Sequence, residues 1–453
     1  MKNADNMPVA LRDMKLRSGD FRVLAVCSME QIIGTALSTV VGIVIPLLTL
    51  LLAPKTLSSG LQGLIGAAGL IGISIGAMVI GRLIDDQGYL RWMRICPTLI
   101  AVGGVLPVIV PEVWALIIGM FVAGIGVGGG YDLDSAYISE IMPDKWKQFM
   151  VGVAKGTCAF GFVIAAGIGW WVVSHTTDPK VWRLLPLIIV ALGVLTLLMR
   201  LNWRNSPIWL ARQGKMAEAQ SAAEFFVGKG VEVLPPAKKD DDAPVPSYGD
   251  FFKGKNLCKV IYSGLTWACE GLGVYGFGVF LPVLIMALGI DRSNAVGMAK
   301  VVNSVEMTFW INLFIIPGFA LGLLIVRRIN HAMMMGWGFV GCVVGLALLA
   351  VAYTLHLPVW VSVLAFLIFE LTLQGGPHLV TFIIPSAIYN VAERGTGTGI
   401  ASMLGKVGAV LGVFFMPMLL EAGGMMCVLY VSMAVMALGA VITFIFGKIL
   451  NQL

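Results

Sequence analysis

Six carboxylates lie inside long apolar stretches of this 453-residue chain: Glu30, Asp132, Asp134, Glu270, Glu306 and Glu370. An acid near the middle of a bilayer costs about 2.5–3.5 kcal/mol on insertion scales, so a chain rarely carries several without using them. Such acids take up protons, attract cations and accept hydrogen bonds from hydroxyl groups. Together they predict a polar cavity that favours protons, cations and hydroxyl-rich ligands over bare organic anions.

Other side chains are expected to share this cavity. Asp132 and Asp134 are two residues apart and point to different sides of a helix, so at most one should face the cavity. His378 follows a Gly-Gly-Pro sequence and is as compatible with a helix break as with a ligand. The predicted substrate-binding or proton-coupling residues are Glu30, Asp132, Asp134, Glu270, Glu306, Glu370, Lys406, Trp267 and Tyr275.

The elements that carry these residues are long apolar runs. The chain is 58% hydrophobic and only 12% charged, whereas soluble domains carry roughly 25% charged residues. Runs of about 20 apolar residues predict membrane-spanning helices. We find twelve, at residues 22–52, 60–83, 91–110, 113–141, 148–174, 181–201, 257–288, 296–326, 332–356, 359–388, 396–420 and 424–448. The predicted fold is therefore an all-α membrane protein.

A single long polar stretch divides the twelve runs. Residues 202–256 contain several prolines and a run of three aspartates, which indicates a linker, with a short surface helix possible near 214–227. The predicted domains are an N-terminal six-helix bundle (1–201), a linker (202–256) and a C-terminal six-helix bundle (257–453).

Basic residues predict the orientation. Of the 31 lysines and arginines, five would lie outside if the N-terminus were inside: Lys55, Lys180, Arg183, Arg292 and Lys300. Because lysine and arginine accumulate in cytoplasmic loops, both termini and the linker are predicted to be cytoplasmic. The net charge of +6 is then explained by topology, and no nucleic-acid partner is expected.

The loop after the second run carries a motif suited to a gate. It contains Gly81, Leu83, Asp85, Gly88 and Arg91. The glycines allow a tight turn, and the aspartate can pair with arginines that hold a gate shut. This loop resembles the signature loop of the major facilitator superfamily, although Asp86 stands where arginine is usual. The loop after the eighth run keeps Gly322, Leu324, Arg327 and Arg328 but lacks the aspartate.

Three further stretches resemble sugar porters and their bacterial inner-membrane metabolite-transporter relatives. They are the glycine run of Gly124, Gly126 and Gly128 with Glu140 at its end, the segment Ser206–Leu210, and Gly375–Pro377 with Glu393 and Arg394. The resemblance implies two pseudo-symmetric bundles that rock around a central site. It also implies gating roles for Gly81, Asp85, Gly88, Arg91, Glu140, Arg327 and Arg394.

The resemblance carries over to single positions in the cavity. A carboxylate in the first helix often takes the coupling proton in such relatives, and Glu30 occupies that place. Its usual arginine partner in the fourth helix is replaced by Met120, so the relay looks incomplete. Glu270 stands where sugar porters place glutamines, and Lys406 stands where some relatives have arginine.

These features predict a secondary active transporter. The sequence contains no nucleophile motif, no P-loop and no histidine cluster, so neither an enzyme nor a cofactor is expected. We predict a monomer in the inner membrane that moves a small polar metabolite (sugar-like, polyol, or organic acid or cation) by alternating access. Proton-coupled symport is favoured. The alternatives are a drug or organic-cation exporter working by proton antiport, and a non-transporting receptor on the same fold.

Overall fold

The structure is a computed structural model. It describes residues 16–54, 57–143, 145–227, 233, 248–289, 295–326, 328–389 and 391–450, which form helices and connecting segments without strands. Eleven helical segments of this part are long and apolar enough to cross a membrane. The last of them bends at Gly423 and Gly424, whose backbone angles are not helical, and so contributes two arms. The twelve predicted spans are confirmed.

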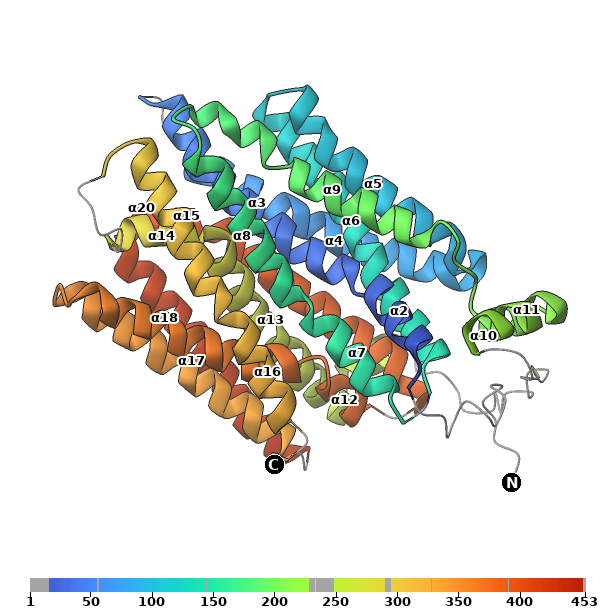
Figure 1. Ribbon diagram of the computed structural model, residues 1–453. Coiled ribbons are helices and arrows are strands. Elements are labelled where there is room, and N and C mark those ends of the chain that lie inside the picture. The colour runs from blue at the N-terminus through green and yellow to red at the C-terminus, as the bar shows by residue number, and fades with distance from the viewer. Residues whose placement is uncertain are drawn as a thin grey trace. The chain divides into compact units, whose positions relative to one another are not determined.

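The first six spans and the segment after them contain eleven elements (Figure 1). The spans are α2 (Ser18–Val26) with α3 (Met29–Leu52), α4 (Ser59–Gln87), α5 (Tyr89–Ile109), α6 (Val113–Ile141), α7 (Lys147–Gly156) with α8 (Cys158–Ser174), and η1 (Pro179–Leu184) with α9 (Leu187–Arg200). The helices α10 (Pro207–Arg212) and α11 (Met216–Val227) follow.

The remaining elements begin with η2 (Tyr248–Phe252). The seventh span runs through α12 (Gly254–Val260), η3 (Ile261–Leu265), α13 (Thr266–Gly271), η4 (Leu272–Phe277) and α14 (Gly278–Leu288). The others are α15 (Met298–Leu313) with α16 (Ile315–Ile325), α17 (His331–Thr354), α18 (Val359–Leu373) with η5 (Gln374–His378) and α19 (Ile384–Ile388), and the two arms of α20 (Val391–Ile449).

Several spans are interrupted where the sequence suggested continuous helices. The first span turns at Cys27 and Ser28, between α2 and α3. The segments η3, η4 and η5 are π-helical, with the wider turn that often marks functional sites in membrane and soluble helices. These interruptions lie close to the acids singled out above.

The chain forms two compact units, each described here by itself. The first contains residues 1–35, 72–161 and 186–243. Within it α5 packs against both α6 and α9 (Figure 1). The glycine run makes close packing possible, since a Cβ on Gly126 would overlap the carbonyl oxygen of Cys96 on α5 and one on Gly128 that of Ile73 on α4.

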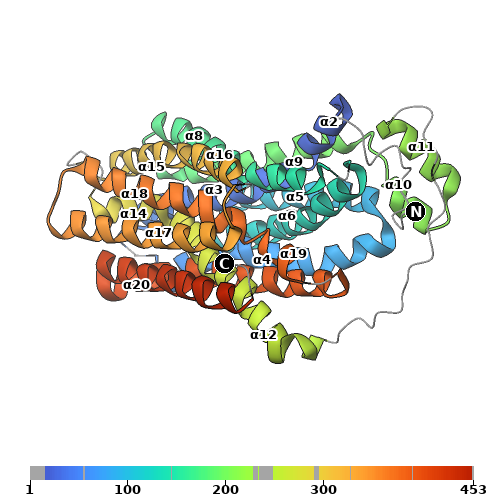
Figure 2. The ribbon, with the colours of Figure 1, turned by 90° about the horizontal axis from the view of Figure 1, so that it is seen from below.

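The second unit contains residues 36–71, 162–185 and 244–453. Within it α17 lies beside α18 and α20 (Figure 2), and α13 packs against α20. The boundaries of the two units fall inside the first, second, fifth and sixth spans and in the segment before η2. The two units are defined by contacts between residues and therefore differ from the two six-helix bundles predicted from the sequence. The two bundles stay a prediction.

The surface helix expected near 214–227 is present as α11. Ser206 caps α10 by accepting hydrogen bonds from the N–H groups of Ile208 and Trp209, and Pro207 occupies the first turn. The two short helices share a small apolar core of Leu210, Ala211, Ala219, Ala222, Ala223 and Val233. At the end of α11, Phe226 packs edge-on against Tyr137 and Trp203, which ties this segment to the first unit.

Candidate functional site

A buried ionic cluster joins three spans of the first unit. Arg200, the last residue of α9, donates from Nη1 to Glu30 Oε1 at 2.5 Å and from Nη2 to Glu30 Oε2 at 2.6 Å. The same Nη2 donates to Asp134 Oδ1 of α6 at 2.7 Å. The side chains of Arg200 and Glu30 are 0% exposed and that of Asp134 is 2% exposed. One cation therefore faces two anions away from solvent.

The break in the first span helps to hold the arginine. Glu30 lies in the first turn of α3, and Val26 is the last residue of α2. Arg200 Nη2 also donates to the carbonyl oxygen of Val26 at 3.1 Å. A carbonyl at a helix C-terminus lacks a partner within its helix and carries partial negative charge, so the break supplies a further acceptor beside the two carboxylates.

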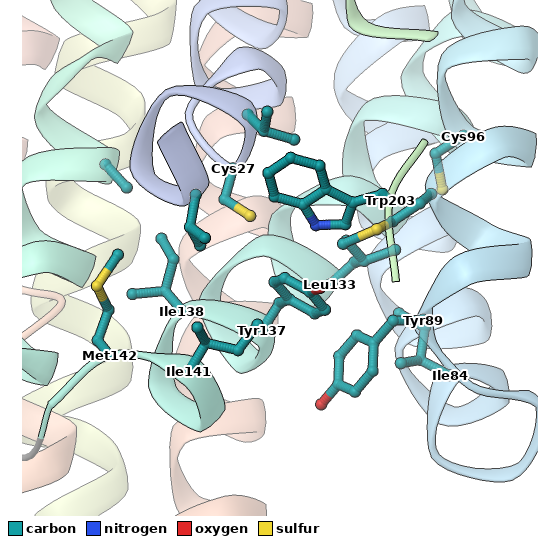
Figure 3. Close-up of a cluster of buried hydrophobic side chains, with 14 of the residues drawn as sticks. Cys27, Ile84, Tyr89, Cys96, Leu133, Tyr137, Ile138, Ile141, Met142 and Trp203 are labelled. Carbon is teal, nitrogen blue, oxygen red and sulfur yellow. The ribbon is translucent and has the colours of Figure 1, made fainter. Parts of the chain in front are cut away.

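Glycine and apolar packing complete the surroundings of this cluster. A Cβ on Gly130 would overlap the side chain of Glu30, so the glycine makes room for the acid. Figure 3 shows a buried apolar group of the same unit. It includes Cys27, Leu133 and Trp203, which lie within three residues of Glu30, Asp134 and Arg200 along the chain. Apolar packing excludes water and strengthens charge interactions.

A second polar group lies in the second unit, beside two π-helical segments. Glu270 at the end of α13 contacts His378 of η5, with 2.5 Å between Oε1 and Nδ1. On the same span as His378, Glu370 Oε2 accepts from Gln374 Nε2 at 3.2 Å. All four side chains are buried. The spacing of Glu370, Gln374 and His378 is four residues at each step, which favours one face of the span.

Aromatic rings surround this second group. The Trp267 ring packs edge-on against Phe382 at 4.8 Å between centroids, and the His378 ring contacts both Phe319 and Phe382. Lys406 Nζ lies 5.9 Å from the centroid of the Tyr275 ring, a cation–π arrangement. Several residues predicted for the cavity, Glu270, Glu370 and Trp267, are thus brought into one neighbourhood.

Two predicted acids belong to neither group. Asp132 is exposed on α6 and lies beside Gly81 of α4, so Asp134 is the member of the pair that enters the ionic cluster. Glu306 is half-buried on α15. The structure brings neither of these two acids to the residues described above.

The structure describes the side chains of only some of the predicted gating residues. Glu140 Oε1 lies 3.5 Å from Arg212 Nη1 of α10, the kind of contact expected of a latch. Gly88 has a φ of 81°, which favours glycine, and the Trp209 ring lies where a Cβ would be. Arg91 is exposed. The side chains of Asp85 and Arg394, and the whole of Arg327, lie outside the described residues.

Sequence reasoning missed two partners. Arg200 is one of the basic residues whose distribution predicts the topology, but it is buried against Glu30. The sequence feature that could have indicated this burial is the position of Arg200 directly after an apolar run. The sequence leaves the role of His378 undecided, and in the structure His378 is the partner of Glu270. Met120, at the usual arginine position, is a buried apolar residue.

The fold and the buried polar groups are those of a multi-pass membrane transport protein. A model of the family "Sugar (and other) transporter" matches residues 30–448, and the chain belongs to this family, the sugar-porter type of the major facilitator superfamily. It is a transporter of small-molecule substrates, as the sequence predicted.

Curated relatives match nearly the whole chain. The inner membrane metabolite transport protein YgcS of Escherichia coli (strain K12) is 23% identical over 97% of this chain and 94% of its own length. A probable inorganic phosphate transporter 1-6 of Arabidopsis thaliana is 24% identical over 88% of this chain and 85% of its own.

Solved structures show the same twelve-helix, two-domain fold. The xylose transporter XylE from Escherichia coli, in a partially occluded inward-open conformation, has a TM-score of 0.76 at 17% identity, covering 94% of this chain and 99% of that chain. A D-xylose-proton symporter has a TM-score of 0.75 at 18% identity, covering 94% and 97%.

Proposed function

We propose that this transporter is a proton-coupled symporter for a small, neutral, hydroxyl-rich metabolite such as a sugar or polyol. The observation that carries the proposal is the single guanidinium of Arg200 between the buried carboxylates of Glu30 and Asp134. The D-xylose-proton symporter among the structural neighbours lends support to this kind of coupling.

Charge counting explains how the cluster would handle a proton. With both carboxylates ionised, Glu30, Asp134 and Arg200 carry one net negative charge, and burying net charge is costly. One added proton makes the cluster neutral. The closed, dry cluster should therefore hold one proton and release it when water reaches the acids. In this proposal Glu30 binds the coupling proton, as the sequence predicts, and Asp134 shares that proton with Glu30.

The second polar group supplies the features that a hydroxyl-rich ligand needs. Gln374 Oε1 is buried and accepts no hydrogen bond from the described residues, so it can accept one from a substrate hydroxyl. The acids Glu270 and Glu370 add acceptors, and Trp267 adds a face for the apolar side of a sugar ring. Two carboxylates would repel phosphate, which argues against the substrate of the phosphate-transporter relatives.

We further propose a location in the inner membrane, as a monomer, with both termini and the segment that carries α10 and α11 in the cytoplasm. The unequal distribution of lysine and arginine between the two sides supports this orientation. The inner-membrane location of YgcS, as its name states it, supports the choice of membrane.

Transport by proteoliposomes tests the proposal. Wild-type protein should accumulate a sugar or polyol against its gradient when the outside is acidic. Glu30→Gln should abolish this accumulation, because the remaining acid and Arg200 are neutral without a proton, while exchange of labelled for unlabelled substrate continues. Accumulation by Glu30→Gln at the wild-type level contradicts proton coupling at the cluster, and uptake only with the inside acidic indicates an exporter.

A substrate screen tests the second group. Sugars, polyols, organic acids, amines and phosphate are offered in the exchange assay. Glu270→Gln and Gln374→Leu should each raise the half-saturating concentration of the accepted substrate at least about tenfold, since each removes an acceptor. Glu421→Gln, at an exposed position of α20, is the matched control and should leave it unchanged.

A further inference from the structure

A pocket with basic walls opens at one end of the first unit, separate from both polar groups. It has a volume of about 500 Å³ and is lined by Gln87, Leu90, Arg91, Arg94, Ile95 and Asn205. These residues come from the end of α4, the first turns of α5 and the segment after α9. In the proposed orientation this end faces the cytoplasm.

The polar lining consists of hydrogen-bond donors and amides. Arg94 Nη2 donates to the carbonyl oxygen of Leu201 at 3.3 Å, which tethers its guanidinium beside the pocket. Asn205 Oδ1 accepts from the Leu90 N–H at 2.7 Å, so its amide nitrogen stays available as a donor. Arg91 is exposed one turn before Arg94. Among the side chains that the structure describes, no carboxylate lines the pocket, and two guanidinium groups do.

The fold adds to this positive character. The pocket lies at the N-terminal end of α5, a helix of 21 residues that begins at Tyr89. The N-terminus of a helix carries partial positive charge and favours anions. Guanidinium groups bind phosphate oxygens in pairs of parallel hydrogen bonds. A phosphate group is the ligand that this combination of donors fits.

Apolar surface beside the pocket indicates where the phosphate comes from. Leu198 and Leu201 at the end of α9 are 59% and 49% exposed, and α9 packs against α5. Exposed apolar side chains on a spanning helix face lipid tails in a bilayer. Leu90 and Ile95 add apolar side chains to the pocket lining, and the Leu201 carbonyl oxygen accepts from Arg94 of the same lining. Donors for a headgroup phosphate and a surface for acyl chains therefore lie together.

We propose that this pocket binds the phosphate of an anionic phospholipid at the cytoplasmic membrane surface, with Arg91 and Arg94 as the phosphate ligands. Basic pockets between spanning helices on the cytoplasmic side recognise such headgroups. Arg91, which the family resemblance assigned to the gate, binds lipid in this proposal. The site needs neither the substrate nor the proton cluster and does not depend on the proposed symport.

Native mass spectrometry of the full chain with added lipid tests the site. Wild-type protein should retain phosphatidylglycerol or cardiolipin in preference to phosphatidylcholine. The Arg91→Gln/Arg94→Gln variant should lose at least about tenfold of this affinity, as expected when paired charge-assisted hydrogen bonds are removed. The matched control, Lys145→Gln/Lys215→Gln, removes the same charge from exposed positions outside the pocket and should keep it.

Thermal melting in detergent provides a second measurement. Phosphatidylglycerol should raise the melting temperature of wild-type protein and of the lysine control, but not of the arginine variant. Equal loss of binding in both variants overturns the proposal, because net charge would then explain it. An equal shift with inorganic phosphate also overturns it, because the pocket would then be a site for free phosphate.

Discussion

Glu30 and Arg200 form a two-point ion pair in which neither side chain is exposed, although 170 residues separate them in sequence. The cation that balances the first-span acid thus comes from the sixth span, whereas the family resemblance placed it in the fourth. Glu30 therefore has an arginine partner although Met120 stands at the usual arginine position.

Removing this cation should destabilise the protein. Breaking a buried pair by removing one partner costs about 3–5 kcal/mol, because a buried charge is left uncompensated. Arg200→Met should therefore lower the apparent melting temperature in detergent by several degrees at neutral pH. A melting temperature equal to wild type would show that the pair contributes nothing.

Neutralising the second acid should uncouple transport. In Asp134→Asn the remaining pair of Glu30 and Arg200 is neutral without a proton. Proton-driven accumulation should fall at least about tenfold, while exchange continues. Asp132→Asn is the control, because this acid is exposed and outside the cluster. Equal effects of the two substitutions would argue against a special role for Asp134.

Adding one methyl group beside Glu30 should disturb the cluster. A Cβ at position 130 would overlap the Glu30 side chain, whereas nothing lies within 4 Å of a Cβ at Gly152. Gly130→Ala should cut transport at least about tenfold, as overpacking shifts side chains and backbone. Gly152→Ala should transport like wild type. The measurement is the initial rate of uptake by proteoliposomes that contain each variant. Equal rates for the two variants would contradict the prediction.

The spans could be predicted because they are long apolar runs. The buried acids could be predicted because they are charged residues inside those runs. Glu30, Asp134, Glu270 and Glu370 stand out as charges within apolar runs, and each is buried. The partners were harder to predict. Arg200 follows an apolar run, where basic residues usually mark a loop, and its burial depends on a helix break at Cys27 that no glycine or proline announces.

The pairing across spans could not come from one sequence. Glu270 and His378 are 108 residues apart, and their contact depends on how the seventh and tenth spans rotate. Three π-helical segments change that rotation, and the hydrophobic period does not reveal them. For Asp132 and Asp134, the sequence predicted that at most one would face the cavity, but it did not predict which one.

The latch between Glu140 and Arg212 should contribute little to stability. The Arg212 side chain is 60% exposed, and exposed ion pairs contribute about 0–1 kcal/mol. Glu140→Ala should therefore change the melting temperature slightly and alter the uptake rate by a few-fold, with the same substrates accepted. A changed substrate profile would place Glu140 in the binding site. Asp85→Ala should likewise alter the uptake rate while the same substrates are accepted.

Chemical labelling should reveal the orientation. Five of the seven cysteines are buried, so replacing Cys258 and Cys427 by serine leaves little background labelling of native cysteines. Thr177→Cys, exposed before η1, should react with a membrane-impermeant maleimide in intact cells, and Gln213→Cys, exposed after α10, should react only after lysis. The opposite pattern would reverse the proposed topology.

The π-helical segments have a consequence for comparing this chain with its relatives. A π-turn arises when one residue is inserted into an α-helix, so every position beyond it is shifted by one in the helical repeat. The seventh span contains two such segments, η3 and η4, on either side of Glu270. Where the seventh span of a relative is a continuous α-helix, an ungapped alignment pairs residues that point in different directions. Gaps of one residue at these segments are needed before positions near Glu270 are equated with those of such a relative.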